Sequence, residues 1–270
     1  MSSLARSLER LLDSSAVAPA PAPPRPLLPL AETRRQWLPV SAHIRQRYLV
    51  TYRAPAARLR ALLPAPLTVD AYEGYGFVSV CALDMTDMGI VGLPSWLRFD
   101  NRELLYRVGV RVRGQPSFFT LRSDVSSGAL ALLGRFSCYR LRRAQVTAQR
   151  ADGRLRLTCR SVDGRADADF EAATTPAADV TSARDSIFRD AERAAAFLLG
   201  MRFSTDVAPD GRVLVQDIDH DPWGARFVEP TRCELPFMDH LGLLIGAPLS
   251  YDNTLVMANL RQTWRAARWI

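Results

Sequence analysis

Between residues 45 and 220 the chain shows a succession of short strand patterns, and this feature limits its possible folds more than any other. Residues 48–52 (YLVTY) are β-branched and aromatic, and residues 103–114 (ELLYRVGVRVRG) alternate Val with Arg. Residues 138–150, 154–162 and 166–174 follow as three successive antiparallel strands. Few helical segments separate these patterns, and there is no βαβ alternation. We therefore expect a mainly β (α+β) fold, built as an antiparallel barrel or cone.

Two segments depart from the strand patterns. Residues 184–199 predict one long helix, because Ile187, Ala191, Ala194 and Leu198 are spaced to share a buried face. Residues 1–35 combine a short amphipathic helical pattern at 3–13 with a Pro-rich stretch at 16–30. We therefore divide the chain into an N-terminal arm (1–35) and one β-barrel domain (36–270). The arm either lies at the periphery or docks on a sister subunit.

Every basic residue of this chain is an arginine. Lys and Arg together number 35 among the 270 residues, and the sequence contains no Lys. A guanidinium stays protonated and cannot act as an amine nucleophile, so imine formation on a lysine side chain is excluded. The formal net charge is +7, but the Arg residues are spread from Arg6 to Arg268 in runs of no more than two. We therefore expect no nucleic-acid partner.

The remaining composition favours a cytoplasmic location. No run of 18 apolar residues encodes a membrane span, and the first 24 residues lack the continuous apolar segment of a secretory signal. The four cysteines, at positions 81, 138, 159 and 233, form no CxxC pair, which is typical of free thiols in a reducing compartment.

Generic motifs for cofactors and metals are missing from the sequence. It holds no P-loop, GxSxG or HExxH motif, so no cofactor is expected. Residues 217–221 (DIDHD) place three Asp side chains on one face of a strand and His220 on the other, so no metal is expected there. Arg107, Arg111 and Arg113 have two interpretations. They form either the solvated face of a strand or an anion-binding wall inside a barrel, and a shift of one residue in register decides between them.

Three segments resemble the acetoacetate decarboxylases and their relatives, in the order and spacing of that family. Residues 43–70 (HIRQRYLVTYRAPAARLRALLPAPLTVD) resemble its first strand and helix. Residues 130–144 (LALLGRFSCYRLRRA) are similar to the segment that leads from Gly-Arg-Glu to the family's adjacent lysines. Residues 230–240 (PTRCELPFMDH) resemble a later motif that ends in His. Residues 210–223 (DGRVLVQDIDHDPW) resemble the uncharacterised YqjF-like relatives. The resemblance implies a β-cone and a homo-oligomer.

The resemblance also implies roles for individual residues. The family's substrate-site Arg falls on Arg45 and its catalytic Glu falls on Glu103. Its lysine pair, one member of which forms the imine, falls on Arg142 and Arg143. Arg135, of the Gly-Arg pair, and His240, of the last motif, are further substrate-binding candidates. The sequence departs from the family at Phe136, where Glu is expected, and at Leu141, where Pro is expected.

These departures predict an acetoacetate decarboxylase-like protein that lacks Schiff-base chemistry. Arg at the lysine positions keeps a positive charge that can clamp a carboxylate or stabilise an enolate oxygen. Burial would raise the pKa of Glu103 and a nearby Arg would lower it, so the sign of the shift stays open. We expect a lyase or isomerase acting on a small carboxylate or β-keto compound. The alternatives are a non-catalytic receptor for a small acidic or lipophilic metabolite, and a barrel with a structural role only.

Overall fold

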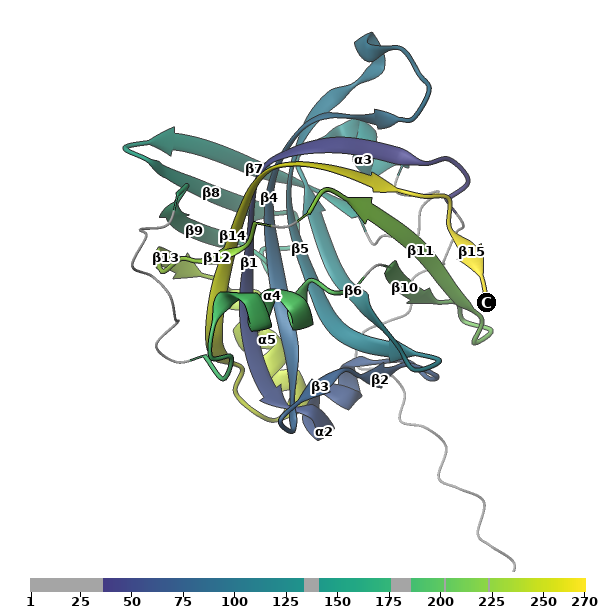
Figure 1. Ribbon diagram of the computed structural model, residues 1–270, viewed down its shortest axis with the longest axis vertical. Helices are drawn as coiled ribbons and strands as arrows, with labels where there is room; N and C mark the ends of the chain where they lie inside the picture. The colour runs from purple at the N-terminus through teal and green to yellow at the C-terminus, as the bar shows by residue number, and fades with distance from the viewer. Residues whose placement is uncertain (1–35, 134–140, 176–185, 202, 223) are drawn as a thin grey trace, which may run out of the picture.

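The computed structural model describes residues 36–133, 141–175, 186–201, 203–222 and 224–270. Long strands dominate this part of the chain (Figure 1). The strands are β1 (Val40–Pro55), β2 (Thr68–Val69), β3 (Ala71–Tyr72), β4 (Tyr75–Ile90), β5 (Phe99–Val112), β6 (Gln115–Val125), β7 (Leu141–Ala151), β8 (Arg154–Ser161), β9 (Ala168–Ala173), β10 (Phe203–Val207), β11 (Val213–His220), β12 (Arg226–Phe227), β13 (Pro230–Glu234), β14 (Ser250–Trp264) and β15 (Arg268–Trp269). The α-helices in the described ranges are α2 (Ala56–Leu59), α3 (Gly128–Leu133), α4 (Ala191–Leu198) and α5 (Pro236–Ile245).

Seven strands close into a ring through their pairings. The order is β6, β10, β11, β14, β1, β4, β5 and back to β6. Most pairings are antiparallel, but β10 joins β6 in parallel over a short stretch, which completes the closure. The mainly β barrel or cone expected from the sequence is confirmed.

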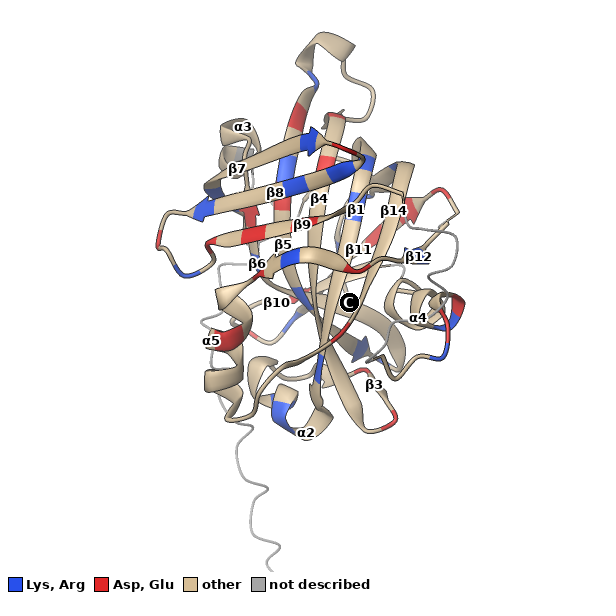
Figure 2. Cartoon of the chain, turned by 90° about the vertical axis from the view of Figure 1, so that its left-hand side faces the viewer, with Lys and Arg blue, Asp and Glu red and all other residues tan. Residues whose placement is uncertain are grey.

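A second group of strands extends from the ring and covers part of it. β7 pairs with β6 in parallel at residues 141–143, and β8, β9 and β13 continue this sheet. The antiparallel pairing of β7, β8 and β9 confirms the three strands predicted from the alternating segments after residue 138. In Figure 2 this sheet, which we call the outer sheet, crosses in front of β4 and β5.

The two faces of the ring strands pack into two hydrophobic clusters. On β5, Leu104, Tyr106, Val108 and Val110 belong to a cluster that also takes in the outer sheet and α5, whereas Leu105 belongs to a second cluster with α4. We call these the outer-sheet face and the α4 face of the strands. Alternation along a strand therefore decides which of the two environments each side chain enters.

The expected long helix at 184–199 is wrong in its length. α4 begins after Asp190, whose carboxylate caps the helix by accepting a hydrogen bond from the Arg193 backbone N–H at 2.8 Å. Residues 187–190 form bends instead, and Ser186 and Ile187 bond to the carboxylate of Asp252. A cap and a tertiary contact therefore override the apolar periodicity. α5, which the sequence analysis did not predict, is the longer helix.

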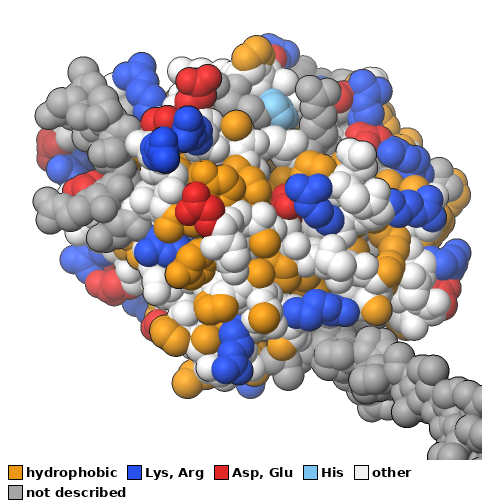
Figure 3. Space-filling view, turned by 60° about the horizontal axis from the view of Figure 1, so that its bottom comes forward, with side chains coloured by type: hydrophobic (Ala, Val, Ile, Leu, Met, Phe, Trp, Pro, Cys, Tyr) orange, Lys and Arg blue, Asp and Glu red, His pale blue; other side chains and the backbone are white. Residues whose placement is uncertain are grey.

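The charges of the surface are mixed. On the face shown in Figure 3, Arg side chains lie scattered among acidic and hydrophobic ones rather than in one patch. Among the described residues, no helix is both long and apolar enough to cross a membrane.

Candidate functional site

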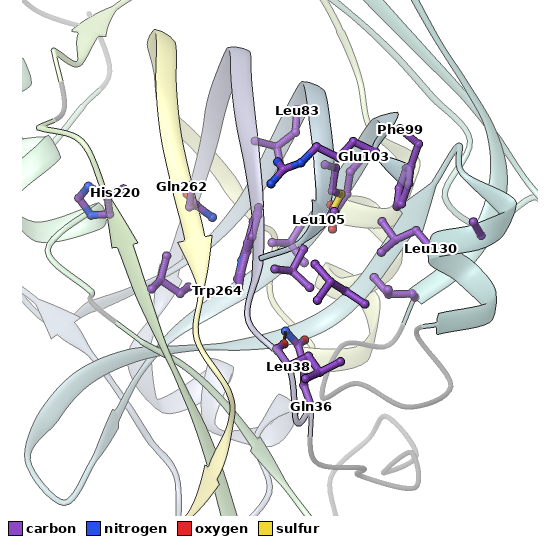
Figure 4. Close-up of a pocket in the computed structure, with 18 of the residues that line it drawn as sticks. Gln36, Leu38, Leu83, Phe99, Glu103, Leu105, Leu130, His220, Gln262 and Trp264 are labelled. Atoms are coloured by element: carbon purple, nitrogen blue, oxygen red, sulfur yellow. Dashed lines mark hydrogen bonds between the residues drawn. The ribbon is translucent and has the colours of Figure 1, made fainter. Parts of the chain in front are cut away.

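A cavity of about 470 Å³ lies on the α4 face of the ring strands. This volume is in the usual range for small-molecule sites. Figure 4 shows 18 of its lining residues. The lining comes from β1, β4, β5, β6, β11 and β14, together with α3, the segments at 36–38 and 93–98, Leu141 of β7, and Leu199 and Met201 after α4. Most of the wall is apolar, and the lining includes Leu83, Leu105, Phe118, Leu130, Met201, Ile218 and Trp264.

Strand β5 supplies two charged groups to this cavity. Glu103, Leu105 and Arg107 alternate along the strand, so all three reach the same face and line the cavity. Of the two interpretations of the Arg residues on this strand, the interior wall therefore applies to Arg107 and the solvated face to Arg111. Arg107 is buried in the interior, whereas Arg111 binds Asp70 at 2.7 Å at a more exposed position.

Glu103 is buried, with 7% of its surface exposed, and its closest polar partner is Ser123 of β6. The Ser123 hydroxyl donates to Oε1 of Glu103 at 2.6 Å. Loss of water around the carboxylate raises the pKa of Glu103 to about 7, against lowering contributions from the Ser123 hydrogen bond and the charge of Arg47. Burial therefore outweighs the nearby Arg charge, and the sign of the Glu103 pKa shift is positive. A carboxyl with this pKa populates both protonation states near neutral pH.

Arg47 enters the cavity because β1 contains a bulge. The pairing with β4 passes from Ile44↔Met85 to Gln46↔Asp84, which leaves Arg45 as an extra residue on β1. Arg47 thereby joins Ile44 on the α4 face. It is buried, lines the cavity and donates to the Cys81 sulfur at 3.5 Å.

Arg107 is held by the backbone of α4 and by an aromatic ring. Its Nη2 donates to the Leu198 carbonyl at 3.1 Å, and its guanidinium carbon lies 4.6 Å from the centre of the Phe118 ring. These contacts fix the planar group on the cavity wall.

His220 and Gln262 add two further polar side chains to the lining. They lie on adjacent strands, because His220 of β11 pairs with Gln262 of β14. In Figure 4 they are on the opposite side of Trp264 from Glu103. Alternation along the strand places His220 on the face opposite the three Asp side chains, as predicted from the sequence. That this face lines the cavity was not predicted. Ile218, two residues earlier and apolar, carried that signal.

The residues predicted from the resemblance are not all brought together. Of the candidates that the structure describes, Glu103 alone is among the residues that line the cavity. Arg45 instead donates to Asp84 at 3.1 Å on the outer-sheet face, and Arg142, which is exposed, pairs with Asp163 at 2.8 Å.

The other three candidates are also accounted for. Arg143 lies beside Gly128, where an added Cβ would be 3.6 Å from the guanidinium carbon. His240 belongs to α5, and its ring centre is 6.0 Å from that of Phe237. Arg135 lies outside the described residues.

Two Asp side chains of the DIDHD segment pair with arginines. Asp219 accepts from Arg265 at 2.6 Å, and Asp217 pairs with Arg268. No group of three or more His, Cys, Asp or Glu side chains gathers at metal-binding distance within the part of the chain that the structure describes.

Comparisons with known proteins agree with the fold. A family model, DUF2071, described as an uncharacterized conserved protein, matches residues 41–259. No curated protein matches the sequence. Among solved structures, the chain is similar to an acetoacetate decarboxylase from Legionella pneumophila, at 16% identity and a TM-score of 0.59, over 96% of this chain and 95% of that one.

Two further structures show the same fold. An acetoacetate decarboxylase-like enzyme from Sphingomonas wittichii RW1 matches at 14% identity and a TM-score of 0.57, over 87% of this chain and 93% of that one. The enduracididine biosynthesis enzyme MppR, in complex with pyruvate, matches at 15% identity and a TM-score of 0.55, over 88% and 91% of the two chains. The chain therefore belongs to the DUF2071 family and has the acetoacetate decarboxylase-like fold.

Proposed function

We propose that this protein is an enzyme that moves a proton on a small carboxylate or β-keto compound, as a lyase or isomerase, without forming an imine. The observation that carries the proposal is the buried Glu103, whose pKa lies near 7, on the wall of a cavity that also holds the guanidinium groups of Arg47 and Arg107. The MppR structure with bound pyruvate supports this substrate class, because it places a small keto acid in a protein of the same fold.

Each polar group has a role in this chemistry. The carboxylate of the substrate binds a guanidinium, for which Arg47 and Arg107 are the candidates. Glu103, when ionised, removes a proton from the carbon beside the carbonyl, and the second guanidinium stabilises the enolate oxygen that develops. Protonated Glu103 then returns a proton to carbon. The Ser123 hydroxyl fixes the orientation of the Glu103 carboxyl through its hydrogen bond.

The proposal revises the residues expected from the resemblance. Glu103 keeps its role, and Arg47 and Arg107 replace Arg45, Arg142 and Arg143 as the anion-binding groups. No lysine side chain exists to form an imine. Borohydride reduction in the presence of pyruvate should therefore leave no adduct on a side chain, as judged by mass spectrometry of the intact protein and its peptides.

The direct test is exchange of substrate hydrogen with solvent. The protein is incubated in D₂O with pyruvate or 2-oxobutyrate, and deuterium in the methyl or methylene group is followed by NMR. We expect protein-dependent exchange that falls by about 100-fold or more in Glu103→Gln, because the group that takes the proton is lost. Glu234→Gln, at an exposed position on β13, is the matched control and should exchange as the wild type does.

A second function is favoured by the apolar walls of the cavity. A receptor for an acidic metabolite with an apolar part would use the same cavity without turnover. Calorimetry separates the two functions, because a receptor keeps its affinity in Glu103→Gln and shows no exchange in any variant. In both cases Arg107→Gln should weaken carboxylate binding by about tenfold. Absence of both exchange and binding across a panel of keto acids and carboxylates would contradict both functions.

A further inference from the structure

Three arginines converge on one buried carboxylate outside the cavity. Asp84 of β4 is almost fully buried. Its carboxylate accepts hydrogen bonds from Arg45 at 3.1 Å and from Arg150 at 2.9 Å, and the Nε of Arg102 lies 3.7 Å from it. We call Arg45, Arg102 and Arg150 with Asp84 the Asp84 cluster.

The cluster joins the ring to the outer sheet. Arg45 is the bulged residue of β1, Arg102 is on β5 directly across from Asp84, and Arg150 comes from the far end of β7. Figure 2 shows the outer sheet passing in front of β4 and β5, where these strands carry charged residues. The cluster is separate from the cavity, because Asp84 and Leu83 are consecutive on β4 and only Leu83 lines the cavity.

The charges of the cluster do not balance. Three guanidinium groups face one carboxylate, which leaves a formal excess of two positive charges. The Arg45, Arg102 and Arg150 side chains are 40%, 32% and 41% exposed, so solutes reach them from solvent. A clamp between the outer sheet and the ring would need only the pair formed by Arg150 and Asp84. Additional like charges at the same carboxylate repel one another unless an anion joins them.

Two donors of the cluster are left without an acceptor among the described residues. The Nε atoms of Arg45 and of Arg102 are both buried and have no hydrogen-bond partner there. A buried N–H without an acceptor costs free energy, so the single carboxylate of Asp84 does not satisfy the donors of the cluster.

We propose that the Asp84 cluster is a binding site for a phosphate group, separate from the cavity and from the function proposed for it. A phosphate dianion matches the excess of two positive charges, and its oxygens suit the planar fork of arginine. A monocarboxylate supplies half of that charge. The ligand is inorganic phosphate or the phosphate group of a monoester, since the exposed side of the cluster leaves room for the rest of a larger molecule.

The test is calorimetric titration of the full chain with inorganic phosphate at constant ionic strength, with acetate as the monoanion and a simple alkyl phosphate as the monoester. We expect saturable phosphate binding and none with acetate at this site. Arg102→Gln and Arg150→Gln should each weaken phosphate binding by about tenfold or more, because each removes one charged fork. Arg160→Gln on β8 is the matched control, since Arg160 is exposed and pairs with Asp167 at 3.2 Å. Its affinity should stay within about twofold of the wild type.

Two further measurements keep the interpretation unambiguous. Circular dichroism at the titration temperature shows whether Arg150→Gln keeps its fold, and Arg102→Gln removes a charge without removing the contact between β7 and β4. Arg107→Gln changes the cavity alone and should leave phosphate affinity unchanged. Phosphate binding that is lost in Arg107→Gln but kept in Arg102→Gln would place the anion in the cavity and overturn the proposal. So would the absence of saturable binding. A tighter fit of the alkyl phosphate than of inorganic phosphate identifies a monoester as the ligand.

Discussion

Burial of Glu103 links the stability of the protein to pH. Its pKa is raised from an ordinary value of 4.5 to about 7 in the folded state. Between these two pH values the folded state holds a proton that the unfolded state has lost, so the free energy of unfolding decreases as pH rises through this window. The contribution lost is on the order of 3 kcal/mol, and it stays lost above pH 7.

Glu103→Gln should remove this pH dependence. The amide is neutral at all pH values. Position 103 of the variant therefore contributes the same unfolding free energy at pH 7.5 as at pH 5. Urea unfolding of both proteins at several pH values between 4.5 and 8 checks the difference in slope. Asp124, whose pKa is also raised by burial, is present in both proteins and contributes to the pH dependence of each. Parallel curves for the two proteins would show that the Glu103 pKa is not raised.

Two buried tyrosines differ in a way that stability measurements can detect. The Tyr48 hydroxyl donates to the Ala173 carbonyl at 3.0 Å, whereas the Tyr106 hydroxyl is buried without a hydrogen-bond partner among the described residues. Burial raises the pKa of both hydroxyls, so both are protonated at neutral pH. Tyr48→Phe should cost about 1 kcal/mol of unfolding free energy, while Tyr106→Phe should be neutral or stabilising. Equal losses in chemical denaturation would reveal an acceptor for Tyr106.

Glu103 was predictable from the sequence, and Arg47 was not. Glu103 could be found because the resemblance fixed its distance from the Gly-Arg pair, and because alternation along β5 is regular around it. Arg45 and Arg47 are two residues apart and would share a face in a regular strand. The bulge at Arg45 separates them, and no local signal in the sequence shows where a strand accommodates an extra residue. His220 and Gln262 meet through long-range pairing of β11 with β14, which a single sequence does not reveal.

Strands were predicted better than helices for a physical reason. Segments such as β5, β7 and β8 alternate between an apolar face and a polar or charged one, and that pattern has few other solutions. Helical periodicity before α4 was misleading, because Ser186 and Ile187 bond to the carboxylate of Asp252 instead of entering a helix. α5 was missed, although Pro236 at its first turn and Gly246 after its end are both typical helix boundaries.

The start of α4 depends on Asp190. Its carboxylate accepts a hydrogen bond from the Arg193 N–H, one of the donors that a helix leaves unpaired at its first turn. Asp190→Ala should therefore lower the unfolding free energy by about 1 kcal/mol, and Asp190→Asn, which keeps a capping oxygen, should lose much less. Thermal and urea unfolding of the two variants checks the difference. If the alanine and asparagine variants were equally stable, the cap would not be what begins the helix.

Among the described residues, the strand pairings that close the ring all follow the arm predicted at residues 1–35. β1 pairs with β14 from Val40 opposite Trp264 onwards. The parallel pairing of β10 with β6 joins residues 204–205 to residues 118–119. The outer sheet attaches through β7, far along the chain from the arm. These pairings depend on contacts distant in sequence, so we expect the ring and the outer sheet to unfold as one cooperative unit.

Deletion of residues 1–35 should therefore leave a folded domain. We expect a single cooperative thermal transition in the shortened chain, with strand content by circular dichroism like that of the full chain. Light scattering after size exclusion measures the second part of the prediction, that the full chain is a homo-oligomer. A smaller assembly after deletion, with the transition intact, means that the apolar face of residues 4–12 docks on a neighbouring subunit. Loss of the cooperative transition would instead show that the arm is part of the domain, because strand pairing alone would then be insufficient to hold the ring closed.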